Sequence, residues 1–251
     1  MRPSAAEVAR TLARGRLGGV LRFADGAPVT GFHHATDRIG RPLLLAAPGD
    51  GLAARLRASG PAEVRLTVDD VPPHRGAPSL GRVRLSGILL PVPRSATRPA
   101  VLEYARSRPI PELFDVGDRI TMHRIEIDRV SFSRSGAAEA IDPAEYAAAE
   151  PDPLHECERD LLDDLARHHM AQLGHHLRHL LDAKGTAYDG TPRVRRLDRY
   201  GLVVDLGDAP AGPGRRWLRL EFARPVSGRH DLAHLMHPIL FHCHHSSDGC
   251  A

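Results

Sequence analysis

The chain has 251 residues, 42% of them hydrophobic and 26% charged, with a formal net charge of +3 at pH 7. That composition is typical of a soluble globular protein of two ordinary domains. No uncharged apolar run approaches the roughly 18 residues of a membrane helix, and the N-terminus has no apolar signal-peptide core, so we expect a cytoplasmic protein without a membrane partner. Basic and acidic residues are interleaved, which does not indicate nucleic-acid binding.

The first part of the chain combines short strands with short helices. Ser4-Ala-Ala-Glu7 is a capping box that predicts a helix to about Arg14. Apolar or alternating runs predict strands at 17–23, 28–35, 42–46, 62–68, 82–90 and 122–132, with short helices over 51–58 and 99–106. The first three strands are separated by turn signals and are expected to form a meander. Six strands with two short helices predict a split β-barrel.

A proline-rich stretch separates this region from a second domain. Residues 142–153 contain three prolines, so we place the boundary between domains of residues 1–148 and 149–251. Asp152-Pro153 is expected to start one long amphipathic helix that ends near Ala183. Strands over 192–200, 201–206 and 215–222 follow, then a C-terminal helix that Pro238 kinks or ends. The fold class is therefore α+β, a split β-barrel followed by a small α+β domain.

Several strings in this order of elements resemble the HugZ-type haem-degrading split-barrel family. In the barrel they are Ala13-Arg-Gly-Arg-Leu-Gly-Gly-Val20 and Ala35-Thr-Asp-Arg-Ile-Gly-Arg-Pro-Leu-Leu-Leu45. In the second domain they are His169-Met170, Leu197-Asp198-Arg199-Tyr200-Gly201 and Phe222-Ala-Arg-Pro-Val226. The resemblance implies a barrel like that of pyridoxamine-phosphate oxidases, a homodimer, and a haem iron held by a histidine of a C-terminal loop.

The chain also departs from the pattern of that family. Where the family has His-Met-Asn-x-Asp-His, this chain has Ala171, Leu173 and Gly174 in place of the later polar residues. The glycine-rich loop after the last barrel strand is replaced by Ser131-Phe-Ser-Arg-Ser-Gly136, with one glycine. Residues 46–55 and their neighbours offer only Arg55 and Arg57 as anion binders, so bound FMN is not expected.

Twelve of the sixteen histidines follow residue 154, and imidazole both binds metals and titrates near neutral pH. His168, His175 and His179 share one predicted helix face, as in a two-histidine metal site, or are ordinary solvated positions. His169 and His176 fall on or beside the apolar stripe, which favours packing. His230, His234 and His237 recur at helical spacing and are interpreted as an exposed face.

The tail differs, because its pattern is not amphipathic. It contains His242, Cys243, His244, His245 and Cys250. We expect one histidine, in the order His245, His244, His242, to ligate haem iron, with Arg199 among the residues that pair the propionates. Alternatively, these histidines and thiols bind zinc, nickel or copper, or the tail is incidental.

The leading hypothesis is a haem-binding protein, either a haem-degrading oxygenase or a haem-responsive accessory protein, and the altered motif favours the second. An enzymatic form would be an oxidoreductase resembling haem oxygenase, for which no catalytic residue is identified. The alternative is a non-catalytic interaction module with a protein partner that binds a transition metal through its tail. A flavin-dependent oxidoreductase is the third hypothesis.

Overall fold

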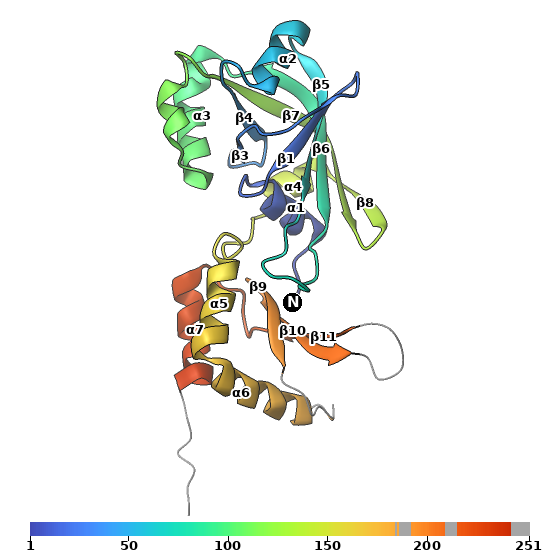
Figure 1. Cartoon of the computed structure of the whole chain (residues 1–251), viewed down its shortest axis with the longest axis vertical. Coiled ribbons are helices and arrows are strands. Elements are labelled where there is room, and N and C mark those ends of the chain that lie inside the picture. Colours follow the sequence, from blue (N-terminus) through green and yellow to red (C-terminus); the bar gives the residue numbers. More distant parts are fainter. Residues whose placement is uncertain (184, 186–191, 209–214, 242–251) are drawn as a thin grey trace, which may run out of the picture. The chain divides into compact units, whose positions relative to one another are not determined.

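The chain folds into two compact units in a computed structural model that describes residues 1–183, 185, 192–208 and 215–241 (Figure 1). Residues 3–71 and 79–151 form the barrel unit, and residues 1–2, 72–78 and those from 152 onward form the α+β unit. The division therefore falls after residue 151, whereas the sequence placed it after residue 148. No helix within the described ranges is long and apolar enough to cross a membrane.

The barrel unit is built on one antiparallel sheet of eight strands. Its strands are β1 (Gly19–Phe23), β2 (Pro28–Val29), β3 (His34–Thr36), β4 (Pro42–Ala46), β5 (Ala62–Asp69), β6 (Arg82–Pro91), β7 (Thr121–Arg134) and β8 (Ala137–Ile141). The spatial order is β2-β1-β5-β6-β7-β4-β3, and β8 pairs with β7. This curled sheet confirms the predicted α+β class with an N-terminal split β-barrel.

The predicted meander of the first three strands is wrong. The run 28–35 divides into β2, which pairs with β1, and β3, which pairs with β4 at the opposite end of the strand order. Residues 30–33 lie outside any strand and include Gly31 at φ +76°. Because glycine enters this region of backbone space at little cost, the chain can leave one edge and join the other.

The helices of the barrel unit start at recognisable caps. In α1 (Ala5–Ala13) the Ser4 side chain accepts from the Glu7 amide and the Glu7 side chain accepts from the Ser4 amide, as the capping box predicted. In α2 (Gly51–Ser59) the Asp50 carboxylate accepts from the Ala53 amide. The remaining helices are α3 (Arg94–Ser107), the 3₁₀ turn η1 (Pro111–Asp115) and α4 (Pro143–Ala148).

Two apolar clusters fill the barrel unit. The larger lies on the inner face of the sheet and includes residues of α1, β1, β5, β6 and β7, such as Leu12, Leu21, Leu66 and Leu85. The smaller packs α3 against β3, β4 and β7, with Tyr104 and Met122 among its members. Alternate residues of β4 face the two clusters, since Leu44 belongs to the first and Leu43 and Leu45 to the second. A strand buried on both faces explains the continuous apolar run at 42–46.

The α+β unit consists of three helices and a three-stranded sheet. The elements are α5 (Glu158–His168), α6 (Met170–Ala183), β9 (Arg193–Asp198), β10 (Gly201–Asp208), β11 (Arg215–Glu221) and α7 (Arg229–Phe241), with the strand order β11-β10-β9. Leucines of α5 and α6 pack with Leu232 and Met236 of α7 against β9 and β10 in one core. The sheet and C-terminal helix match the sequence prediction, and α7 continues past Pro238.

The single long helix predicted before this sheet is instead two helices that meet at His169. The backbone of His169 has φ −128° and ψ 10°, outside the helical region. Apolar positions recur every fourth residue through Leu165, Leu173, Leu177 and Leu181. In a straight helix the first and last would point about 160° apart. Breaking the helix allows α5 and α6 each to turn its leucines toward the same core.

The predicted start of that helix is also wrong. The Asp152 carboxylate accepts from the Leu154 amide at 2.8 Å, but residues 153–157 form a turn and α5 begins only at Glu158. The second Asp152 oxygen accepts from the Arg199 amide at 3.2 Å. Asp152 therefore joins the turn before α5 to the β9–β10 hairpin instead of capping a helix.

Candidate functional site

The tail residues predicted to bind iron or metal lie outside the described residues. These are His242, Cys243, His244, His245 and Cys250. Within the described ranges, no group of three or more His, Cys, Asp or Glu side chains is arranged to hold a metal ion. The tail assignments therefore remain predictions.

Arg199 lies in the turn between β9 and β10. Its guanidinium carbon is 5.8 Å from the centre of the Tyr200 ring, and its carbonyl accepts from the Val226 amide at 2.8 Å. Below it, burial and the neighbouring Asp198 carboxylate raise the pKa of Asp152 to about 7. Arg199 is thus half-buried in a polar turn, and its role toward a haem propionate remains a prediction.

Two of the three strings that carry the resemblance in the second domain meet at this turn. The Tyr200 carbonyl accepts from the Phe222 amide at 2.8 Å, alongside the Arg199–Val226 bond. Asp198 accepts from the Tyr200 amide and from the Arg219 guanidinium. A Cβ at Gly201 would lie 2.0 Å from the Leu220 carbonyl oxygen, so only glycine fits there. These strings therefore form the β9–β10 turn and the segment after β11 that is hydrogen-bonded to it.

The histidines of the helices do not form one face. His168 belongs to α5, whereas His175 and His179 belong to α6 and are exposed. His169 lies at the break between the helices, and His176 is half-buried with its pKa lowered by burial. The rings of His230 and His234 lie with their centres 4.4 Å apart, and those of His168 and His169 with their centres 6.4 Å apart.

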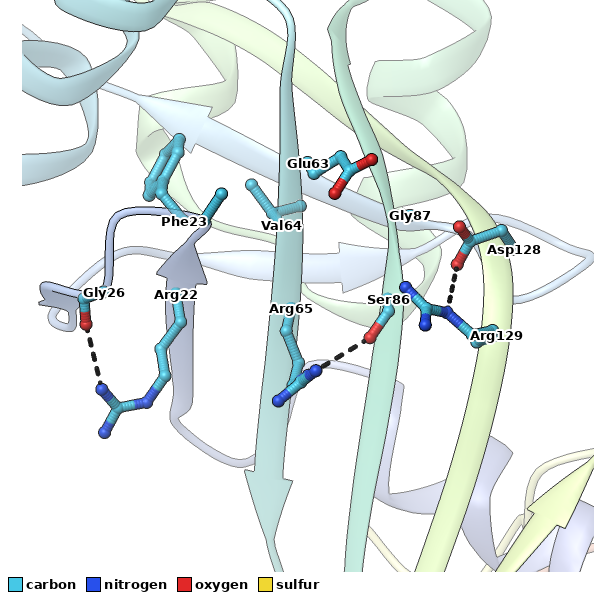
Figure 2. A pocket seen from close by; sticks show the side chains of 11 residues that line it. Arg22, Phe23, Gly26, Glu63, Val64, Arg65, Ser86, Gly87, Asp128 and Arg129 are labelled. Atoms are coloured by element: carbon cyan, nitrogen blue, oxygen red, sulfur yellow. Dashed lines mark hydrogen bonds and ion pairs between the residues drawn. The ribbon is translucent and has the colours of Figure 1, made fainter.

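A hollow of about 290 Å³ opens on the outer face of the barrel sheet, across β1, β5, β6 and β7 (Figure 2). Three arginines and a serine cross it as one row, each directly opposite the next in the strand pairing. Arg22 of β1 faces Arg65 of β5, Arg65 faces Ser86 of β6, and Ser86 faces Arg129 of β7. We call these four residues the arginine row.

A β-bulge shapes one side of this hollow. Ser86 is opposite Arg129 and Gly87 is opposite Ile127, so Asp128 is the extra residue of β7. A Cβ at Gly87 would lie 2.0 Å from the Glu126 carbonyl oxygen, which makes glycine necessary for this close approach. Bulges increase local twist and redirect side chains. The bulge therefore turns Asp128 and Arg129 together toward solvent at the edge of the hollow.

Two carboxylates, Glu63 and Asp128, line the hollow together with the three arginines, so its lining has a formal excess of one positive charge. The Arg22 guanidinium donates to the Gly26 carbonyl at 3.2 Å, and Arg65 donates to the Ser86 hydroxyl at 3.3 Å (Figure 2). Arg129 and Asp128 are 3.5 Å apart and highly exposed, so this ion pair contributes little. Like charges directly opposite each other in a sheet are unfavourable.

An anionic ligand would relieve this repulsion. Guanidinium groups pair with carboxylates and phosphates through two parallel hydrogen bonds, and the Ser86 hydroxyl adds a further donor. Phe23 and Val64, which also line the hollow, are buried beneath it. The arrangement is therefore suited to hold the acidic edge of a ligand at the barrel surface.

By contrast, Arg55, one of the two anion binders identified near residues 46–55, contacts other side chains of the barrel unit. It forms an ion pair with Asp25, and its guanidinium carbon is 5.3 Å from the centre of the Phe23 ring. Arg57 is exposed on α2. These contacts hold Arg55 against the end of the β1–β2 hairpin.

A second polar feature of the barrel unit is buried. His34 of β3 is 1% exposed, and burial together with the Arg108 guanidinium lowers its pKa to about 4. Burial likewise raises the pKa of Tyr104. The His34 Nε2 and Tyr104 Oη atoms have no hydrogen-bond partner within the described part of the chain. His34 is therefore a neutral residue of the barrel interior.

The comparisons with known proteins identify the fold. No protein-family model matches the sequence, and no curated protein matches it. Among solved structures, the chain is similar to a haem-binding protein from Mycobacterium smegmatis, with 21% identity and a TM-score of 0.66 over 96% of this chain and 97% of that one. Both chains therefore share the split barrel and the α+β unit over nearly their whole length, which confirms the predicted resemblance at the level of the fold.

Two further structures are similar at lower scores. A protein of unknown function from Agrobacterium tumefaciens has 17% identity and a TM-score of 0.45, over 92% of this chain and 93% of that one. ChuZ from Campylobacter jejuni has 11% identity and a TM-score of 0.42, over 53% of this chain and 56% of its own. Scores of this size add nothing to the fold assignment.

The arginine row was not predicted from the sequence. Each arginine occupies an outward position of an alternating strand, where a charged residue is ordinary. Their alignment depends on the pairing of β1 with β5, which are separated by three other strands in the sequence. The alternation of polar and apolar residues in each strand can be read from the sequence, but the register between the strands, which aligns the charges, cannot.

Proposed function

We propose that this protein binds haem and acts as a haem-responsive or haem-carrying accessory protein. The observation that carries the proposal is the full-length similarity of the fold to the haem-binding protein from Mycobacterium smegmatis. The family resemblance of the sequence supports it independently of that similarity. We further propose that the protein is a homodimer and acts in the cytoplasm.

The arginine row fits the acidic part of haem. The two propionates need cationic donors at a surface that leaves the rest of the group accessible, and Arg22, Arg65 and Arg129 provide them. The hollow is too small and too polar to enclose the whole macrocycle, since buried ligand sites are usually larger. Ile88, 46% exposed and two residues from Ser86 along β6, offers apolar surface on the same face.

The proposed iron ligand is a tail histidine, His245, His244 or His242 in that order. Bound haem would supply an iron that a neutral imidazole can ligate and that can bind a small exogenous molecule. The chain's own contribution would be to present this imidazole and to pair the propionates with arginine side chains. Arg199 is retained as a second candidate for a propionate.

The α+β unit favours an accessory role over haem degradation. At the position of the family's polar motif, Leu173 is 2% exposed within the core of the unit. Gly174 is also buried, and neither residue can donate or accept through its side chain. Buried apolar residues therefore stand where the family has polar side chains that would orient a reacting group.

A titration of the full chain with haem tests the use of the arginine row. The variant carries Arg22→Ala, Arg65→Ala and Arg129→Ala, and it should bind haem about 2 to 30 times more weakly, as expected for two exposed ion pairs. The control removes three exposed arginines of α3 instead, Arg94, Arg98 and Arg106. The control loses the same charge, so equal weakening by both variants would mean that only the net charge matters and would contradict this site.

A further inference from the structure

The exposed face of α7 carries a line of histidines. His230, Ala233, His234 and His237 are exposed, whereas Leu232 and Met236 on the other side of the helix are buried in the core of the α+β unit. Positions separated by three and four residues lie on one face of a helix.

Two of these histidines have the geometry of a chelating pair. The Nε2 atoms of His230 and His234 are 3.0 Å apart, and the ring planes are inclined by 84°. An ion about 2.05 Å from both nitrogens, an ordinary distance from a metal to imidazole nitrogen, would see them at an angle of about 94°. One ion could therefore replace the hydrogen bond between the two nitrogens, with the imidazole rings turning so that both lone pairs face it and the helix unchanged.

An angle of about 94° is nearer to some coordination geometries than to others. Two neighbouring ligands of a square-planar or octahedral ion are about 90° apart, whereas tetrahedral Zn²⁺ requires about 109°. Imidazole is a good ligand for Ni²⁺ and Cu²⁺, which accept the square-planar or tetragonal arrangement. Water would complete the coordination, because the pair is exposed.

The nearby carboxylate is engaged elsewhere. Asp231, between the two histidines in sequence, accepts from the Arg224 guanidinium and from the amide and hydroxyl of Ser227. These contacts fix the start of α7 and lower the pKa of Asp231. The carboxylate is thus held toward the residues that precede the helix, and imidazole nitrogens are the donors of the site.

We propose that His230 and His234 form a surface site for a divalent ion of square-planar or octahedral preference, Ni²⁺ or Cu²⁺ ahead of Zn²⁺. The site uses neither the tail nor the arginine row, so it is independent of the proposed haem function. It needs no third protein ligand, and within the described residues no group of three metal-binding side chains is formed there.

Equilibrium dialysis of the full chain against Ni²⁺ tests the proposal. The variant with His230→Ala and His234→Ala should bind about one equivalent less than the unmodified protein, and alanine at exposed helix positions should leave the fold intact. The control carries His175→Ala and His179→Ala, the same residue types at the same spacing on α6, and should keep the equivalent assigned to α7. Unchanged stoichiometry in the α7 variant would overturn the proposal.

A second measurement separates this site from the histidine-rich tail. A variant with His242, His244 and His245 replaced by alanine should still bind one Cu²⁺, with an electron paramagnetic resonance spectrum that shows two coordinated nitrogens. Loss of that signal on replacing His230 and His234 in the same background supports the site. Loss of all tight Cu²⁺ binding in the tail variant alone would contradict it.

Discussion

Replacing Glu158 by glutamine should strongly destabilise the α+β unit, because Glu158 is the counterion of a buried arginine. The two side chains are only 2% and 4% exposed, and Glu158 accepts from two guanidinium nitrogens of Arg196, at 2.8 and 3.0 Å. Glu158 also accepts from the Leu197 amide, while Arg196 donates to the Pro78 carbonyl. Glutamine keeps the shape but leaves the guanidinium charge buried and unneutralised, at a cost of about 3 to 5 kcal/mol.

Urea unfolding followed by tryptophan fluorescence measures this cost, since Trp217 of β11 is the single tryptophan and lies in this unit. At an m-value of about 2 kcal/mol per molar, the urea midpoint should fall by about 2 M. The matched double variant, Glu158→Leu with Arg196→Met, removes both charges and should lose only about 1 to 3 kcal/mol, chiefly from the unpaired Leu197 amide. The reasoning is refuted if the glutamine variant loses less than about 1 kcal/mol, or if the double variant is the less stable of the two.

Three further predictions concern the barrel and its assembly. The folded-state pKa of His34 is about 4, below its ordinary value of 6.5, so the unfolded chain binds more protons between these pH values and the free energy of unfolding should fall as pH drops from 6.5 toward 4. Unfolding followed by circular dichroism should show a weaker fall in His34→Leu. An unchanged slope in that variant would contradict the lowered pKa of His34. Gly87→Ala should lower the free energy of unfolding by about 1 to 3 kcal/mol because the added Cβ meets the Glu126 carbonyl. Gly18→Ala, with open space around it, should leave the free energy of unfolding nearly unchanged in thermal melts of both variants. Equal effects of the two substitutions would contradict the steric explanation. Light scattering should give the mass of a dimer, and a monomer at micromolar concentration would show that the predicted pairing is wrong.

The sequence predicted the elements well where the signal was local. The capping box at Ser4 and Glu7 forms as expected, and each predicted strand of the barrel lies where alternation placed it, apart from the run 28–35. That run failed because hairpin signals describe neighbouring strands, and its second half pairs across the sheet. Local turn chemistry cannot specify such a partner.

The long helix failed for a different reason. The helix was predicted from apolar positions that recur at three and four residues, whereas the leucines that are buried, from Leu165 to Leu181, depart over sixteen residues from the true helical repeat by nearly half a turn. The drift was present in the sequence and could have predicted the break at His169. The arginine row could not have been found in the same way, because it requires the register between β1 and β5.

The absorbance spectrum of the full chain, produced with haem supplied, tests the central claim most directly. We expect a Soret band that remains after free haem is removed and corresponds to one haem per chain. Replacing His245, His244 and His242 by alanine should shift or abolish this band, with His245→Ala expected to act most strongly among the single variants. A spectrum of the unmodified protein with no Soret band above the free-haem background would contradict the proposed function.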